Sequence, residues 1–401
     1  MKIAKKFKKS ENGSITLMVL MAMIFMLAVI TSSYLAISNE SIGQNRKVSQ
    51  ITKQYQVTEE DIVQEYGEVF DNIEKLTIDQ VRSNDMLNRT INTVTSDTYG
   101  NKIVIPAGFK VTDDAIDVTQ GIVIEDKEGN QFVWVPIGDI YTDVERTEEN
   151  KKTITLGRYD FAEDGTVSDY SGNDTEDTAE EHNSEYGNAI AKDIEEFKTS
   201  ANNNSGYYIG RYEAGLLEGT LDITDMTNGF TAPGDNWTGW IKEDGTDVQM
   251  VCKQEQQVWN YVTQNKASEL SRNMYASDKF TSDLINSYAW DTAIVFIQTF
   301  GKENNSKLYA YQSGFSIDTT KASTTGTGIL IDTNTVDKQC NIFDMAGNVY
   351  EWTTETSRNS ICPCICRGGI FDTNTNYTSY SRSLEVTLAQ DRRSFRPLLY
   401  L

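Results

Sequence analysis

Few residues of this chain are of the types that bind transition metals or act as nucleophiles: it has five Cys and one His. Cys362, Cys364 and Cys366 alternate along the sequence, and on a strand this spacing would place three thiols on one face. Such a face could hold a metal or a reactive pair, although zinc sites normally use C-x2-C spacings. Outside a cell some of the five cysteines could instead pair as disulfides, leaving at least one free thiol. The sequence leaves these alternatives open.

The single histidine restricts the chemistry further. His182 lies in a stretch rich in acidic and small polar residues. One histidine cannot form the multi-histidine ligand set of a non-haem iron site. A Ser-His-Asp triad would also have to use His182, and nothing around this residue resembles a nucleophile elbow. We interpret His182 as a surface residue.

Two further clusters point to binding rather than catalysis. The stretch DMAGNVYEW contains the carboxylates of Asp344 and Glu351 around a glycine turn, and hard cations prefer such oxygen donors. The stretch after Arg367-Gly368-Gly369 is rich in Asp, Thr, Asn, Tyr and Ser, a composition typical of adaptable binding loops, although an ordinary polar loop is the alternative. The predicted ligand-binding residues are Asp372, Thr373, Asn374, Asn376, Tyr377, Tyr380 and Arg392.

The overall composition fits a folded domain outside the cell. The net charge of −23 argues against nucleic acid as a partner, because neutralising phosphates requires clustered Lys and Arg. A strongly acidic surface leaves divalent cations as plausible partners.

The N-terminal part predicts a membrane anchor. Residues 1–13 form a basic leader, which we expect in the cytoplasm, and residues 14–37 carry no charge. At about 1.5 Å per residue the latter stretch can cross a hydrocarbon core of roughly 30 Å, with the C-terminal domain extracellular. A cleaved signal peptide would have a shorter apolar region. The start at Gly13 is similar to type IV pilin-like precursors, but the glutamate usual in their apolar helix is absent. Residues 38–98 follow with helical periodicity and are predicted to be a helical stalk.

Residues 99–401 change to short strand-like runs. A hairpin is predicted from Ile122–Ile124 and Phe132–Pro136 with its turn at Gly129-Asn130, and a further strand at Gly206–Gly215. Helices are predicted near Gln254–Tyr261 and at Leu284–Phe300. Residues 160–196 are strongly acidic and are interpreted as a solvated insertion, with calcium attraction as a weaker alternative.

Five motifs occur in order along this region. They are Phe132–Pro136, Tyr208–Glu213, Asp344–Trp352, Arg367–Gly369 and Phe395–Pro397. In this combination the chain resembles the formylglycine-generating enzyme and sulfatase-modifying-factor superfamily, over roughly residues 101–401. The resemblance implies a C-type-lectin-like fold.

The resemblance also carries expectations for individual residues. It implies a structural calcium held by the side chains of Asp344 and Glu351 and the backbone carbonyls of Gly347 and Val349. The copper-binding cysteines of the active enzymes fall on Thr373 and Thr378, and threonine cannot supply a thiolate. The oxidase chemistry is therefore not expected. Trp352, Arg367 and the following glycines are interpreted as structural.

The sequence therefore predicts an α+β protein with a C-type-lectin-like domain on a transmembrane helix and a helical stalk. We expect a non-catalytic cell-surface protein that binds a protein or glycan ligand. Some related lectin-like proteins are diversified by retroelements in this C-terminal stretch, which is one variant of the hypothesis. The alternatives are an oxidase that uses Cys362, Cys364 or Cys366, and a pilin-like subunit with a lectin-like head.

Overall fold

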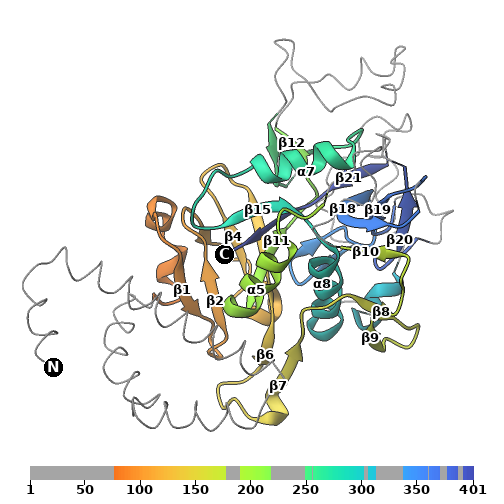
Figure 1. Cartoon of the computed structure of the whole chain (residues 1–401). Coiled ribbons are helices and arrows are strands. Elements are labelled where there is room, and N and C mark those ends of the chain that lie inside the picture. Colours follow the sequence, from red (N-terminus) through yellow and green to blue (C-terminus); the bar gives the residue numbers. More distant parts are fainter. Residues whose placement is uncertain are drawn as a thin grey trace, which may run out of the picture. The chain divides into compact units, whose positions relative to one another are not determined.

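The computed structural model describes residues 76–177, 190–217, 249–254, 256–301, 306–312, 337–359, 361–370, 377–386 and 392–401. Every described residue lies within Ile73–Leu401, which forms one compact unit (Figure 1). The predicted leader and membrane helix and most of the predicted stalk lie outside the described residues. Within the described part, no helix combines the length and the apolar character that a membrane span requires.

The end of the predicted stalk is not an α-helix. Residues 76–98 contain the 3-10 helices η1 (Gln80–Arg82) and η2 (Asn84–Asn88) and the strand β1 (Thr93–Ser96), which pairs with β2 (Lys102–Ile105). Val81 and Met86 are buried in the same core cluster as Ile103. The helical prediction is therefore wrong for this stretch, because tertiary burial and the β-branched run at β1 favour extended backbone.

A six-stranded antiparallel sheet forms the centre of the domain. Its strands, in spatial order, are β15 (Thr281–Leu284), β22 (Pro397–Tyr400), β11 (Gly206–Gly210), β5 (Gln131–Pro136), β4 (Val123–Glu125) and β3 (Lys110–Val111). The C-terminal strand β22 therefore lies inside the sheet, between β15 and β11 (Figure 1).

The predicted hairpin at this sheet is confirmed as β4–β5. Gly129 has a φ of 84°, which the turn requires and which glycine adopts without steric cost. The predicted strand at Gly206–Gly215 is confirmed as far as Gly210, where β11 ends, and the chain then enters β12 (Gly215–Leu216).

Both faces of the central sheet are covered. On β5, Val133 and Val135 belong to one core cluster, whereas Phe132 and Trp134 belong to another. The helices α5 (Ile194–Asn204) and α8 (Ser287–Phe300) pack against this sheet, α5 on β11 and β22 and α8 on β5. This double burial explains why β5 is a nearly continuous apolar run and not an alternating one.

A second sheet carries most of the C-terminal motifs. It consists of β10 (Thr175–Glu176), β18 (Tyr350–Ser357), β19 (Cys364–Arg367) and β20 (Arg382–Glu385) in this order, and β21 (Arg393–Phe395) runs parallel to β18.

Smaller sheets and turns complete the described elements. They are β13 (Met250–Val251), β12 and β14 (Gln257–Val258); the hairpins β6 (Gly138–Tyr141)–β7 (Lys151–Ile154), β8 (Tyr159–Phe161)–β9 (Val167–Asp169) and β16 (Lys338–Gln339)–β17 (Ile342–Phe343); and η3 (Val118–Gln120), η4 (Glu148–Asn150) and η5 (Ser306–Tyr311).

One predicted helix is confirmed and the other is wrong. Helix α8 begins after Asn286, whose side chain accepts a hydrogen bond from the backbone N–H of Ala289, and it ends at Phe300 as predicted. Near Gln254–Tyr261 the chain instead forms β14, and the helix α7 (Gln264–Asn273) begins only after the Thr263 cap. The pairing of β14 with β12 holds this stretch in an extended conformation, so the predicted helix does not form.

The first half of the acidic stretch is ordered, contrary to the interpretation as a solvated insertion. Residues 160–177 contribute to the β8–β9 hairpin and to β10, which pairs with β18. Thr175 and Asp177 are buried. Their polar side chains are tolerated because Glu355, Thr354 and Ser287 provide hydrogen-bond partners. His182 lies outside the described residues. The described part is an α+β domain built mainly from antiparallel strands.

Candidate functional site

The five sequence motifs lie on neighbouring strands. β11 pairs with both β5 and β22, while β18 pairs with both β19 and β21. A Cβ on Gly369 would collide with the carbonyl oxygen of Ala346, so the Arg367–Gly369 motif packs directly against the turn of the Asp344–Trp352 motif. Motifs that are far apart in the sequence are therefore brought together in the fold.

The residues predicted to bind calcium are held mainly by protein partners. Glu351 is fully buried, and both of its carboxylate oxygens accept hydrogen bonds from Arg396, from Nε at 3.0 Å and from Nη2 at 2.6 Å. The backbone N–H of Val349 donates to Glu213 at 3.3 Å, and that of Asp344 donates to the carbonyl of Asp337 at 2.9 Å.

This geometry does not suit Glu351 as a metal ligand, because Arg396 already supplies its positive charge. Among the described residues, no group of three or more His, Cys, Asp or Glu side chains is arranged to hold a metal ion. Calcium binding at Asp344, Gly347, Val349 and Glu351 stays a prediction.

The cysteines are poorly placed for redox or copper chemistry. All five lie in the described residues and none forms a disulfide there, and Cys252, Cys364 and Cys366 are fully buried. Burial raises the pKa of Cys252 to about 11 and that of Cys364 to about 12, and it raises the pKa of Cys366 well above its ordinary value. Because the thiolate is the reactive and metal-binding form, these three are inert at neutral pH.

The two threonines expected at the copper positions differ in what the structure says of them. Thr373 lies outside the described residues. The Thr378 backbone N–H donates to Ser381 Oγ at 2.8 Å, and the two side-chain hydroxyls lie 3.1 Å apart. Thr378 therefore belongs to a tight turn with Ser381, which is closed by a bond from the Ser381 N–H to the Thr378 carbonyl.

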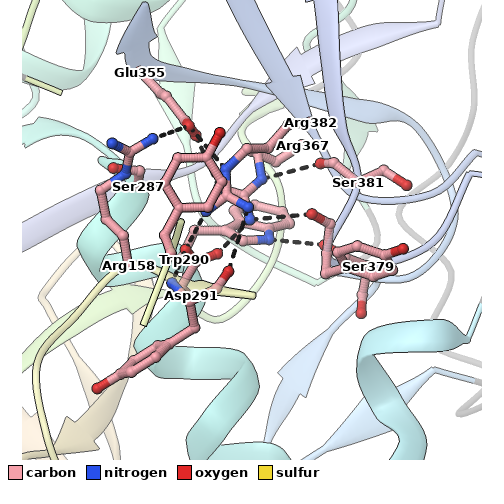
Figure 2. A network of polar contacts seen from close by, with 12 residues as sticks. Arg158, Ser287, Trp290, Asp291, Glu355, Arg367, Ser379, Ser381 and Arg382 are labelled. Carbon is pink, nitrogen blue, oxygen red and sulfur yellow. Dashed lines mark hydrogen bonds and ion pairs between the residues drawn. The ribbon is translucent and has the colours of Figure 1, made fainter. Parts of the chain in front are cut away.

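A buried network of five charged side chains lies beside this turn (Figure 2). Glu355 on β18 accepts from Arg158 Nη2 at 2.5 Å, from Arg382 Nε at 2.8 Å and from Arg367 Nη1 at 2.9 Å. Asp291 on α8 pairs with Arg367 and Arg382. Although burial opposes the shift, Arg382, Arg367 and Arg158 hold the pKa of Glu355 well below its usual range. Both carboxylates and Arg367 are completely buried.

The network reaches the end of the predicted binding loop. Trp290 Nε1 donates to the carbonyl of Ser379 at 2.8 Å (Figure 2). Arg367 donates to the next two carbonyls, from Nη2 to Tyr380 at 3.3 Å and from Nε to Ser381 at 3.0 Å. Sequence reasoning identified Arg367 as structural but missed Arg158, Asp291, Glu355 and Arg382, because no local pattern marks residues that meet only in the fold.

The structure separates the predicted ligand residues into two groups. Tyr377 is 39% exposed, and its ring stands edge-on to Tyr350 with centroids 5.0 Å apart. The exposed Arg392 also contacts Tyr350, whose backbone N–H donates to the Arg392 carbonyl at 2.9 Å. Tyr350, which the sequence did not single out, thus joins these two residues.

Tyr380 has a different environment. Its ring packs 4.8 Å from that of Tyr311 and 6.0 Å from that of Phe161, measured between centroids. This position supports the core more than a ligand face. Asp372, Thr373, Asn374 and Asn376 lie outside the described residues, and their predicted ligand contacts stay predictions.

Asp177 next to this network provides a pH-dependent test. Its carboxylate accepts from the Ser287 N–H at 2.6 Å and from Thr354 Oγ1 at 2.9 Å. Burial, with a smaller contribution from the Glu355 charge, raises the pKa of Asp177 to about 6, although the Ser287 hydrogen bond opposes the shift. In the unfolded chain an aspartate has a pKa of about 3.9. Between this value and the folded pKa of about 6, only the folded state binds the proton. This group therefore makes the free energy of unfolding fall as the pH rises from about 4 to about 6.

We expect Asp177→Asn to remove that contribution. Asparagine can still accept from Ser287 and can donate to Thr354. The stability difference between variant and wild type should shift in favour of the variant by about 1–3 kcal/mol between pH 4 and pH 7. Urea unfolding at both pH values measures it, and a pH-independent difference would contradict the assignment.

Comparisons with known proteins identify no family. No protein-family model matches the chain, and no curated protein matches it. Two solved structures are weakly similar. "Crystal Structure of CarF" has 14% identity and a TM-score of 0.28, covering 49% of this chain and 86% of that one. "Structure of PvdO from Pseudomonas aeruginosa" has 13% identity and a TM-score of 0.29, covering 70% of this chain and 98% of that one. Both scores are too low to support a statement about fold or function.

Proposed function

We propose that this chain is a non-catalytic ligand-binding protein of the cell surface, with its ligand face at Tyr377 and Arg392. The observation that carries the proposal is that both residues contact Tyr350, Tyr377 through its partly exposed ring and the exposed Arg392 through its backbone carbonyl. Tyrosine and arginine are enriched among the residues that dominate binding energy at interfaces. The ligand is a protein or a glycan.

The formylglycine-generating-enzyme-like, C-type-lectin-like architecture is part of the same proposal. It is supported by five motifs that occur in order and lie on neighbouring strands. The surface location depends on the apolar stretch at residues 14–37, for which the sequence is the support.

The oxidase alternative receives less support from the described residues. It needs cysteines that form thiolates and are accessible to a substrate. Cys364 and Cys366 are buried, and burial raises the pKa of both thiols. Cys362 is partly exposed but would have to act without these two neighbours.

The test is a binding screen of the full chain on a glycan array and a peptide array. We expect Tyr377→Ala and Arg392→Ala each to weaken a retained ligand about tenfold or more. Val144→Ala is the matched control, because Val144 is 66% exposed and lies between β6 and β7, outside the proposed face. It should bind like the wild type. An absence of ligands on both arrays, together with copper-dependent oxidation of a peptide thiol, would overturn the proposal.

A further inference from the structure

Three successive carbonyl groups of the segment that follows Tyr377 are fixed by buried side chains. The Ser379 carbonyl accepts from Trp290, and the Tyr380 and Ser381 carbonyls both accept from Arg367. Trp290 and Arg367 are themselves completely buried. Figure 2 shows the two side chains reaching this segment from α8 and from β19.

The same segment is also held by η5 and by the residue that follows it. The Ser379 N–H donates to the Gln312 carbonyl at 3.0 Å, and the Tyr380 N–H donates to the Ala310 carbonyl at 3.3 Å. Ser379 Oγ donates to the Tyr309 carbonyl at 2.7 Å. Backbone donors and acceptors of Ser379 and Tyr380 are therefore all engaged, which is more than an ordinary surface loop requires.

The two donors are difficult to move. The Arg367 guanidinium lies between Glu355 and Asp291 and 5.8 Å from the Trp290 ring. Displacing it would leave two buried carboxylates with reduced compensation, which is costly. The Tyr170 ring adds a further contact, 4.2 Å from the guanidinium of Arg382 and 4.4 Å from that of Arg158.

We propose that Trp290 and Arg367 are positioning residues of the ligand face. They fix Ser379–Ser381 so that Tyr377, two residues earlier, is presented in one orientation before a ligand arrives. This role rests on the proposed function for its biological meaning. A face fixed in advance loses less conformational entropy on binding and so binds more tightly.

Trp290→Phe tests this role, because it removes the indole N–H and retains an aromatic ring. We expect the amides of Ser379 and Tyr380 to exchange hydrogen for deuterium about tenfold faster than in the wild type, the effect of losing one hydrogen bond. On the arrays described above, retained ligands should bind several-fold more weakly. Ser379→Ala is a second variant, which loses only the bond from Oγ to Tyr309 and should raise exchange in the same direction by less.

Trp352→Phe is the matched control. Trp352 is equally buried, donates from Nε1 to the Val262 carbonyl at 2.8 Å and lies 5.2 Å from Arg393. The Trp352→Phe variant should lower the melting temperature to a similar extent as Trp290→Phe, and it should leave amide exchange at Ser379 and Tyr380 unchanged. Unchanged exchange in Trp290→Phe, or equal acceleration in Trp352→Phe, would overturn the positioning role. Exchange requires no ligand, so a wild-type chain that binds nothing on the arrays counts against the proposed function alone.

Discussion

Glu355→Ala is expected to lower the free energy of unfolding by about 3–5 kcal/mol, a large fraction of the stability of an ordinary domain. Glu355 is completely buried and receives hydrogen bonds from three arginines and from Thr175. Removing it leaves three guanidinium groups near one remaining carboxylate, Asp291. Their mutual repulsion and desolvation, more than the lost attraction, account for the size of the effect.

Chemical denaturation at pH 7 measures this loss, and Arg358→Ala is the control. Arg358 pairs with Glu176 at 3.1 Å, but its side chain is 61% exposed. Solvent screens such a pair, so the control should leave stability nearly unchanged. A similar loss of stability in both variants would show that burial does not make the Glu355 network more stabilising than a surface ion pair.

The depressed pKa of Glu355 also makes its contribution to stability depend on pH. That contribution is present above the pKa of the unfolded state, and it is lost as the pH falls towards the pKa of the folded state.

Arg396→Met is expected to cost a similar amount, about 3–5 kcal/mol, for the opposite reason. Arg396 donates to both Glu351 oxygens and to the carbonyls of Gly210 and Phe343. Without it, Glu351 becomes a buried charge near Glu213, whose pKa burial and the Glu351 charge already raise well above its ordinary value. The loss should be smaller at acidic pH, where Glu351 can take up a proton.

A double-mutant cycle isolates this pair. In the double variant Arg396→Met with Glu351→Leu, part of the lost stability should return, with a coupling energy of about 1–3 kcal/mol. The recovery should be incomplete, because the Gly210 and Phe343 carbonyls lose their donor in both cases. Strict additivity of the two single variants would show that Glu351 and Arg396 do not stabilise the fold as a pair. Retention of calcium by the wild type, lost in Glu351→Gln, would show that the predicted metal site forms despite Arg396.

Several features could be predicted because they depend on neighbouring residues in the chain. The β4–β5 turn needs Gly129 at positive φ, and α8 follows from an apolar helical pattern behind a capping Asn286. The same kind of reasoning failed near Gln254–Tyr261, where pairing with β12 decides the conformation. It also failed at the start of the domain, where Val81 and Met86 serve the core and not a stalk.

The candidate site shows the same division. The polar composition after Arg367–Gly369 predicted a binding loop, and Tyr377 is indeed exposed, whereas Tyr380 packs against Tyr311 and Phe161. Composition cannot distinguish these two tyrosines. The burial of Tyr380 depends on its ring contacts with Tyr311 and Phe161, which lie about 70 and 220 positions earlier in the chain.

The sequence by itself determined the glycine turn between β4 and β5, the helix α8 and the order of the five motifs. Only the tertiary structure decided which charges neutralise one another. Arg158 and Glu355 are 197 positions apart, and Arg367 and Asp291 are 76 positions apart, yet they share one buried network. Such pairs form because a buried charge needs an opposite charge within a few ångströms, and spatial distance of this kind leaves no periodic trace in the chain.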